Sequence, residues 1–246
     1  MKRGSWERFF RKRKEHYFLS TLKSYKRKTY RKIFDKIFDK SPKNKIIWIT
    51  DSFDQFYGLD TFHKFRQNNI VIDSDISLLC IKKVRKQYKL ALDIKKVPFK
   101  SNSIDIVISP STVDHFDKIF FSEFLNEIER ILKPRGIAII LLHNKQNIFM
   151  RFLILRILER EKYYTYSKSE VLKTLEAYNN LKLKCILYTF NLPFPLFSTS
   201  FINFLDRHKI KINFIRKIIY KFLDKASEIS EYPYFSELIC FVIKKI

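Results

Sequence analysis

The sequence predicts an α/β fold with a mostly parallel sheet whose two faces are covered by helices. The chain has 246 residues, of which 46% are hydrophobic, and this is enough for one well-packed core. From Lys45 onward, short apolar runs rich in β-branched residues alternate with stretches of helical periodicity. Alternation at this spacing indicates right-handed strand–helix–strand units and therefore a parallel sheet.

The individual elements follow from the period of the apolar residues. Five runs are predicted strands: 46–50, 69–73, 90–94, 104–109 and 136–142. Helices are predicted near 59–67, 76–88, 117–132 and 147–160, and another begins at Ser167, where SKSE fits a capping box. Two more strands are predicted at 183–190 and 236–245, and the aromatic, basic segment 191–234 between them is a predicted helical insertion.

The first 44 residues are a predicted basic helical extension ahead of a domain at 45–246. Apolar residues recur there at spacings of mostly three and four, and Ser41-Pro42 ends the pattern because the residue before a proline avoids helical geometry. Residues 1–45 hold 17 Lys and Arg against four Asp and Glu. A basic end of this kind can bind nucleic acid or an anionic membrane surface. The alternative is that the excess of Lys and Arg in this segment only reflects the lysine-rich composition of the whole chain.

Composition also excludes several classes of protein. The three cysteines (Cys80, Cys185 and Cys240) form no CxxC pair, so we expect neither a disulfide framework nor a metal site. No apolar run approaches the roughly 20 residues that cross a bilayer, and no signal-peptide pattern follows the basic N-terminus. We therefore expect a cytoplasmic protein. Only three glycines are present, which leaves few positions for a glycine-rich binding loop.

Two acidic residues, Asp75 and Asp93, stand at the ends of consecutive predicted strands. In open α/β sheets, ligands bind beyond the carboxyl ends of the strands. An acid at the second strand can accept hydrogen bonds from ribose hydroxyls, and an acid closing the third strand can accept one from an adenine amine. Either acid alone is weak support, because Asp is common in loops.

The segment from Asp93 to Gly136 carries a more specific pattern. Its first part joins an acid, a Pro-Phe pair, a polar turn and an apolar strand, in the stretch LALDIKKVPFKSNSIDIVIS at 90–109. FLNEIERILKPRGIAIILL then joins a helix bearing Glu127 and Arg130 to a Leu-Lys-Pro turn and a buried strand. These motifs resemble those of the class I S-adenosylmethionine-dependent methyltransferases in their small type 11 domain form, and the resemblance covers about residues 45–142.

The resemblance implies a Rossmann-like three-layer sandwich whose seven-stranded sheet is mostly parallel, with an antiparallel C-terminal strand. It also implies S-adenosyl-L-methionine as the cofactor. By position in the motifs, Asp75 with Ile76 would bind the ribose, Asp93 with Ile94 would contact the adenine, and Ser109, next to Pro110, would line the methyl-transfer site. The first strand and its loop would supply three further contacts: Thr50, Asp51 and Ser52.

The first motif departs from the family. The family reads like VLDLGCGTG where this chain reads IIWITDSFD. Trp48 thus replaces the acid of the strand, and Thr50, Ser52 and Asp54 replace the three glycines; Asp73 also takes a position that is usually glycine. An L-residue forced into a left-handed conformation costs about 1–2 kcal/mol. The loop therefore has either a weakened cofactor site or a conformation rebuilt by its own hydrogen-bonding side chains.

Methyl transfer from a sulfonium depends mainly on positioning, so a catalytic base is optional. If a base is used, the candidates are His115, which follows Asp114, and His143, which ends the fifth strand. An ordinary polar residue at a strand exit is the simpler interpretation of both. The family often carries histidine or aromatic residues near the Asp114-His115 position, which favours that pair slightly over His143.

We thus expect a methyltransferase that acts on a small-molecule, lipid-linked or glycan-type acceptor. The segments 149–158 and 191–234 could cover an apolar or membrane-associated substrate, or they could simply pack on the sheet. A catalytically inactive module that binds a protein partner or RNA is the main alternative, favoured by the absent glycines and the basic ends. A metal-dependent glycosyltransferase using Asp73 and Asp75 as a DxD motif ranks lowest, because three-residue motifs arise often by chance.

Overall fold

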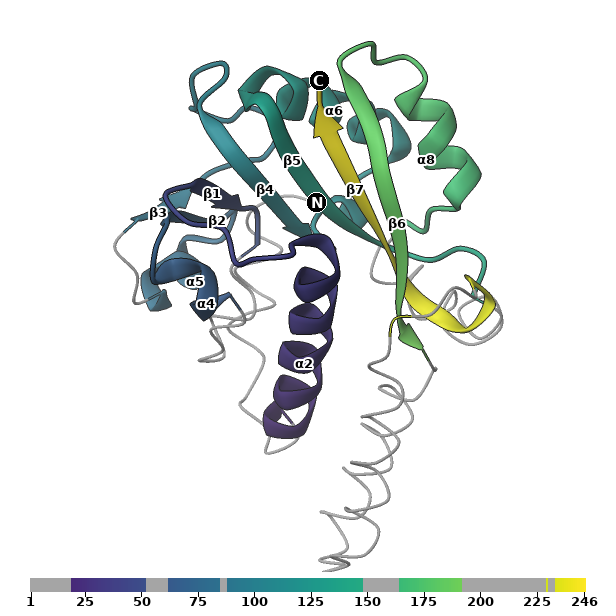
Figure 1. The fold of residues 1–246 in the computed structure, drawn as a ribbon, viewed down its shortest axis with the longest axis horizontal. Coiled ribbons are helices and arrows are strands. Elements are labelled where there is room, and N and C mark those ends of the chain that lie inside the picture. The colour runs from purple at the N-terminus through teal and green to yellow at the C-terminus, as the bar shows by residue number, and fades with distance from the viewer. Residues whose placement is uncertain (1–18, 52–61, 85–87, 148–163, 192–228, 230–232) are drawn as a thin grey trace, which may run out of the picture.

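The computed structural model describes residues 19–51, 62–84, 88–147, 164–191, 229 and 233–246 (Figure 1). Its centre is a seven-stranded sheet with the order β3-β2-β1-β4-β5-β7-β6. The strands are β1 (Ile46–Ile49), β2 (Ile70–Asp75), β3 (Tyr88–Ala91), β4 (Ile104–Pro110), β5 (Leu132–His143), β6 (Leu181–Asn191) and β7 (Ser236–Lys245). Strand β7 runs antiparallel to both of its neighbours, and the first five strands pair in parallel. The predicted fold class is confirmed.

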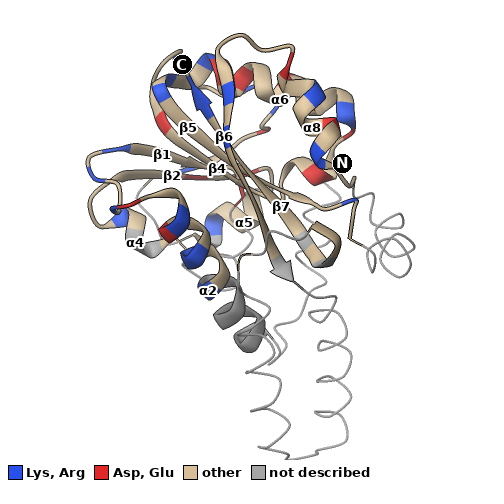
Figure 2. Cartoon of the chain, turned by 45° about the vertical axis from the view of Figure 1, so that its right-hand side comes forward, with Lys and Arg blue, Asp and Glu red and all other residues tan. Residues whose placement is uncertain are grey.

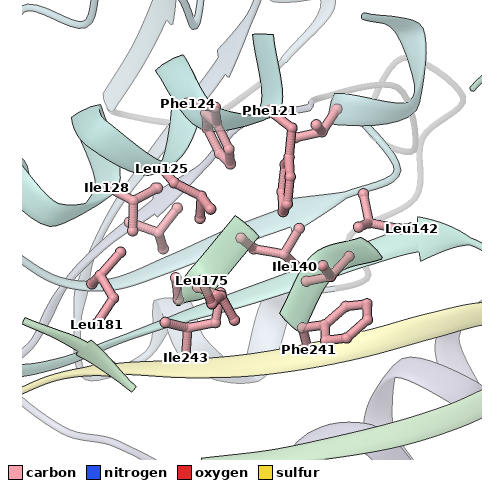
Figure 3. Close-up of a cluster of buried hydrophobic side chains, with 14 of the residues drawn as sticks. Phe121, Phe124, Leu125, Ile128, Ile140, Leu142, Leu175, Leu181, Phe241 and Ile243 are labelled. Carbon is pink, nitrogen blue, oxygen red and sulfur yellow. The ribbon is translucent and has the colours of Figure 1, made fainter. Parts of the chain in front are cut away.

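Helices α6 (Lys118–Ile131) and α8 (Lys168–Leu175) cover one face of the sheet. Figure 3 shows Phe121 and Phe124 of α6 directed toward Ile140 and Leu142 of β5. All four side chains are almost completely buried. Apolar residues two apart along β5 point to the same face, so strand geometry and the helical period of α6 together build this half of the core.

The opposite face of the sheet is covered by α2 (Leu19–Ile37), with α4 (His63–Arg66) beside it. A second buried cluster contains four side chains of α2: Tyr30, Ile33, Phe34 and Ile37. It also contains strand side chains that alternate with those of the first cluster and point to the other face of the sheet, such as Ile139. The ring of Phe34 lies 4.7 Å from that of Phe65 in an edge-on contact. The C-terminal half of α2 is therefore part of the core of the sheet, while residues 1–18 lie outside the described part of the chain.

Several predicted boundaries differ from the structure. Strand β3 ends at Ala91 instead of residue 94, because a turn follows in which Asp93 accepts hydrogen bonds from Lys95 and Lys96. Strand β5 begins at Leu132, earlier than predicted. Helix α5 (Leu78–Lys83) is shorter than predicted, since Ser77 caps its start and Val84 is extended. The predicted helix at 147–160 and most of the insertion at 191–234 lie outside the described residues. No helix among those described is both long and apolar enough to span a membrane.

Glu127 and Arg130, which the motif places at the end of α6, hold the loop that follows β3. Arg130 donates hydrogen bonds to the carbonyl oxygens of Phe99 (2.6 Å) and Val97 (3.2 Å) and forms an ion pair with Glu127 (2.7 Å). Glu127 accepts a hydrogen bond from the Val97 amide in return. The hydrogen bond from Arg130 lowers the pKa of Glu127. The motif therefore positions the loop on which Asp93 lies.

Near the start of β5, Arg135 has a backbone conformation that favours glycine, whereas its neighbour Gly136 has no room for a side chain. Arg135 has φ of 65°, in the left-handed region that favours glycine. Gly136 has no such φ, but a Cβ atom there would lie 2.8 Å from the carbonyl oxygen of Lys133 and 3.1 Å from that of Asp105. Gly136 is therefore needed for the close approach of β5 to β4.

Glu170 links three elements near the carboxyl end of β5. It closes the capping box of α8 with Ser167, accepts a hydrogen bond from Lys145 at 2.9 Å, and forms an ion pair with Lys118. Burial acts to raise the pKa of Glu170, but the hydrogen bonds from Lys118, Ser167 and Lys145 outweigh it and lower the pKa to about 2. The ionised carboxylate therefore stabilises the folded state.

Replacing Arg135 and Gly136 separately should change stability in opposite directions. Arg135→Gly removes the left-handed strain and should raise the free energy of unfolding by about 0.5–1 kcal/mol, after allowance for the extra freedom of glycine in the unfolded chain. Gly136→Ala should lower it by about 1–3 kcal/mol, because backbone atoms must move. Urea denaturation measures both values. A destabilised Arg135→Gly variant would contradict this account of the turn.

Glu170→Gln should change the acid sensitivity of the protein. Because the folded-state pKa of Glu170 lies below its ordinary value of 4.5, its contribution to stability is complete above that value and is lost as the pH falls toward about 2. The variant should be less stable by about 1 kcal/mol at neutral pH, because the amide can still close the capping box but loses the ion pairs with Lys118 and Lys145, and its stability should fall less steeply with acid. Denaturation midpoints at several pH values test this prediction. Glu123→Gln, an exposed change on α6, serves as the control and should follow the wild type.

Candidate functional site

Thr50 joins the carboxyl ends of β1 and β4. Its amide donates to the carbonyl oxygen of Ile108 (3.0 Å), and its hydroxyl lies 3.2 Å from the Ser109 hydroxyl and 2.6 Å from that of Thr112. Thr50 is not among the described residues with positive φ, so the expected left-handed strain is not present at this first glycine position. Here the loop is rebuilt by hydroxyl hydrogen bonds, while Ser52 and Asp54 lie outside the described residues.

Trp48, which replaces the acid of the first strand, is part of the core. Its indole Nε1 donates to the hydroxyl of Ser74 (2.8 Å), which in turn donates to the carbonyl oxygen of Ile49 (3.0 Å). Its ring packs edge-on against Phe99 at 5.2 Å. Trp48 is completely buried and joins β1 to β2.

The two acids of β2 have different surroundings. Asp73 is completely buried and accepts two hydrogen bonds from Arg66, at 2.6 and 2.8 Å. Arg66 therefore competes for the carboxylate that a DxD metal site would need. Asp75 is the last residue of β2, and its Oδ1 accepts a hydrogen bond from the Ser77 amide at 2.8 Å, which orients the carboxylate. Across the described part of the chain, no cluster of three or more His, Cys, Asp or Glu could hold a metal ion.

Asp93 lies in the same corner of the sheet as Asp75. The amide of its neighbour Leu92 donates to the carbonyl oxygen of Asp75 at 3.1 Å. The Asp93 side chain is exposed, whereas Ile94, predicted to contact adenine, is 4% exposed and packs in the core cluster with Trp48. Ile76 is half-buried, and Asp51 is partly exposed at the end of β1.

The structure brings together Asp114 and His143, which the sequence offered as separate candidates. Asp114 lies in the short 3-10 helix η1 (Val113–His115) that follows β4, and His143 ends β5. The Asp114 Oδ2 lies 2.6 Å from the His143 Nδ1, and its Oδ1 accepts the His143 amide at 3.1 Å. The Asp114 side chain is completely buried and that of His143 is 13% exposed.

His115 has a different character from His143. Burial, assisted by the nearby charge of His143, lowers the pKa of His115 to about 3. The ring is therefore neutral at physiological pH and a weak proton acceptor. The preference for an Asp114-His115 pair over His143 is not supported by these surroundings, because the Asp114 carboxylate contacts His143.

Three residues of this region were not predicted from the sequence: Arg66, Thr112 and Tyr166. Thr112 belongs to a polar run after β4, SPSTVDH, that could have drawn attention to it. Tyr166 donates its amide to the carbonyl oxygen of His143 (2.9 Å), and its hydroxyl is buried without a hydrogen-bond partner in the described structure. Burial, with a further contribution from Asp114, raises the pKa of Tyr166. No local sequence signal marks Arg66 or Tyr166.

Comparison with known proteins agrees with this geometry. Residues 49–140 match the family model described as a methyltransferase domain. An uncharacterised protein of Methanocaldococcus jannaschii is 33% identical over 92 residues, which are 37% of this chain and 40% of that protein. The matched region thus spans less than half the length of this relative.

Several solved structures share the fold. A candidate sarcosine dimethylglycine methyltransferase from Galdieria sulphuraria superposes with a TM-score of 0.59 at 15% identity, covering 89% of this chain and 85% of that one. A Thermotoga maritima S-adenosylmethionine-dependent methyltransferase gives 0.57 at 13% identity, covering 93% and 92%. Geranyl diphosphate C-methyltransferase from Streptomyces coelicolor gives 0.54 at 12% identity, covering 86% and 78%.

The family match covers residues 49–140, and the structural likeness extends over most of the chain. The matched residues run from the end of β1 into β5 and include the acids of the site and the Glu127–Arg130 motif. At these identities the solved structures establish the fold of the whole sheet. Residues 49–140 are therefore similar to the methyltransferase domain family, and the chain has the fold of the class I S-adenosylmethionine-dependent methyltransferases.

Proposed function

We propose that this protein transfers a methyl group from S-adenosyl-L-methionine to a small-molecule, lipid-linked or glycan-type acceptor. The observation that carries the proposal is the position of Asp75 and Asp93. Both acids lie at one corner of the carboxyl edge of the sheet, where open α/β folds bind ligands. The methyltransferase family match includes both residues.

The residues present fit an adenosyl cofactor. Asp75 has its carboxylate oriented by the Ser77 amide and would accept hydrogen bonds from the ribose hydroxyls. Asp93 is exposed and would face the adenine. Asp51, partly exposed beyond β1, adds a negative charge that suits a ligand bearing a sulfonium and an ammonium group. The cofactor, when bound, supplies an electrophilic methyl group on sulfur. The S. coelicolor enzyme was solved with S-adenosyl-L-homocysteine, which supports a ligand of this class.

A non-catalytic binding module remains the second candidate. Trp48 and Thr50 favour it, because a core tryptophan and a hydrogen-bonded threonine occupy two positions that the family uses for its acid and its first glycine. Such a module would bind RNA or an anionic membrane through the basic N-terminal region. In the described part of the chain, Lys and Arg are distributed over α2, α6 and α8 (Figure 2).

Calorimetric titration of the full chain with S-adenosyl-L-methionine and S-adenosyl-L-homocysteine tests the proposal. Asp75→Asn and Asp93→Asn should each weaken binding about tenfold to a hundredfold, which corresponds to the loss of about 1.5–3 kcal/mol from a hydrogen bond to a charged group. Asp39→Asn, an exposed change just after α2, should bind as the wild type does.

The two candidate functions give different results in this experiment. Absence of heat with either ligand, together with salt-dependent binding of RNA or anionic vesicles, would overturn the enzymatic proposal and support the module. Binding that survives both Asp variants unchanged would overturn the assignment of these residues.

A further inference from the structure

We propose that this site binds its ligand through the adenosyl half, and that the amino-acid tail of the cofactor adds little affinity. The ligand class is therefore an adenosyl sulfonium or thioether, with or without an amino-acid tail. The inference rests on the proposed function. It adds which half of the ligand this chain recognises.

The tail of a bound cofactor has to pass over the end of β1. The sheet order is β3-β2-β1-β4, and Asp75 ends β2 while Asp93 follows β3. An adenosyl group held by these two acids has the β3 edge of the sheet on one side and β1 on the other. The expected methyl-transfer position at Ser109, on β4, is two strand spacings or about 10 Å from β2. The rest of the ligand therefore crosses Thr50, the first residue after β1.

Three hydroxyls at this crossing use their hydrogens on one another. Thr50 donates its hydroxyl hydrogen to Ser109 at 3.2 Å. Because a hydroxyl has a single hydrogen, the 2.6 Å contact between Thr50 and Thr112 must use the hydrogen of Thr112. Thr50 is 2% exposed and Ser109 is completely buried. The hydroxyl hydrogens of Thr50 and Thr112 are thus directed into the protein and cannot bind a carboxylate.

Two backbone amides beside these hydroxyls are also engaged. The Thr50 amide donates to the carbonyl oxygen of Ile108, and the Ser111 amide donates to that of Leu141, both at 3.0 Å. These bonds continue the pairing of β1 with β4 and of β4 with β5 by one residue. An anion at a strand end is bound by amides that point out of the structure. These two amides point along the sheet.

The loops on both sides of the crossing are acidic. The segment 50–62 after β1 contains three acids and no Lys, Arg or His: Asp51, Asp54 and Asp60. Residues 52–61 lie outside the described part of the chain. The segment 111–117 after β4 contains Asp114 and Asp117 and no Lys or Arg, and burial lowers the pKa of its one histidine, His115, to about 3. Negative charges repel the tail carboxylate and attract the tail ammonium, so the two ends of the tail have opposing effects.

Three lysines at the carboxyl edge of the sheet already have partners. Lys118, the first residue of α6, and Lys145, just after β5, both form ion pairs with Glu170. The Lys95 ammonium, after β3, lies 5.2 Å from the ring centroid of Phe120. A cation over an aromatic face is stabilised by the electrons of the ring. Each of these lysines would give up a partner to bind the tail carboxylate.

The adenosyl half has different surroundings. Asp75 has its carboxylate oriented by the Ser77 amide, and Asp93 is exposed. Both acids would accept hydrogen bonds from uncharged donors of a nucleoside, the ribose hydroxyls and the adenine amine. An acid suits these donors and does not suit a carboxylate. The groups that favour binding are therefore those that face the nucleoside.

Calorimetric titration of the full chain with two thioethers tests the inference. S-adenosyl-L-homocysteine and 5′-methylthioadenosine share the nucleoside and the sulfur, and only the first has an amino-acid tail. We expect their dissociation constants to agree within about threefold. A carboxylate held by hydrogen bonds would favour S-adenosyl-L-homocysteine by about tenfold to a hundredfold. A preference of tenfold or more would overturn the inference, and any smaller preference supports it.

Thr50→Gly should create a preference for the tail, because it frees the hydroxyl hydrogen of Thr112 and removes a side chain from the crossing. The preference for S-adenosyl-L-homocysteine over 5′-methylthioadenosine should rise about fivefold or more. Ser101→Gly, which removes an exposed hydroxyl at the opposite edge of the sheet, should keep the wild-type preference. An unchanged preference in Thr50→Gly would overturn the role of Thr50. The wild-type comparison needs no variant, so it decides the inference even if Thr50→Gly does not fold.

The same titrations separate this inference from the proposed function. If S-adenosyl-L-homocysteine binds and 5′-methylthioadenosine binds at least tenfold more weakly, the cofactor site stands and only the inference fails. If neither thioether nor S-adenosyl-L-methionine gives heat, the proposed function fails, and the inference fails with it.

Discussion

Strands β1, β4 and β5 are buried on both faces, and this double burial determines where polar side chains can lie. Along β5, Ile140 and Leu142 pack beneath α6 and α8, while Ile139 and Leu141 pack toward the face covered by α2. Apolar side chains are required at successive positions, so functional polar groups are displaced to the strand ends. Because the first five strands are parallel, those ends meet at one edge. The site is a consequence of how the core is packed.

Buried charges in this protein serve two purposes. Asp73 and Arg66 form a closed ion pair whose carboxylate is completely shielded, and its role is to fix α4 against β2. Asp114 is equally buried, and its partner His143 is exposed to the same 13% as Arg66, but this partner is an imidazole. A buried carboxylate needs a partner in both cases. An imidazole carries both a donor and an acceptor nitrogen, whereas a guanidinium only donates, and this chemical difference separates the two pairs.

The departures of the first motif are accommodated by packing. Trp48 takes the place of an acid, but its indole N–H donates a hydrogen bond to the hydroxyl of Ser74, and its ring packs against that of Phe99. Thr50 takes the place of a glycine without positive φ, and its hydroxyl forms hydrogen bonds with those of Ser109 on β4 and Thr112 in the following loop. The sequence could show that the glycines were absent. It could not show this compensation, since the compensating groups lie 26 to 62 residues away.

The sequence by itself determined the α/β class, the positions of most strands, and the placement of Asp75 at the end of β2 and of Asp93 shortly after β3. These features depend on periodicity and spacing within short segments, where side-chain direction follows directly from local geometry. Only the tertiary structure decided that Asp114 contacts His143 across 29 residues and that Arg130 holds Val97 and Phe99. Contacts of this kind depend on the register of β4 against β5 and on the path of η1. That register is selected by the packing of the whole core, so no short segment encodes it.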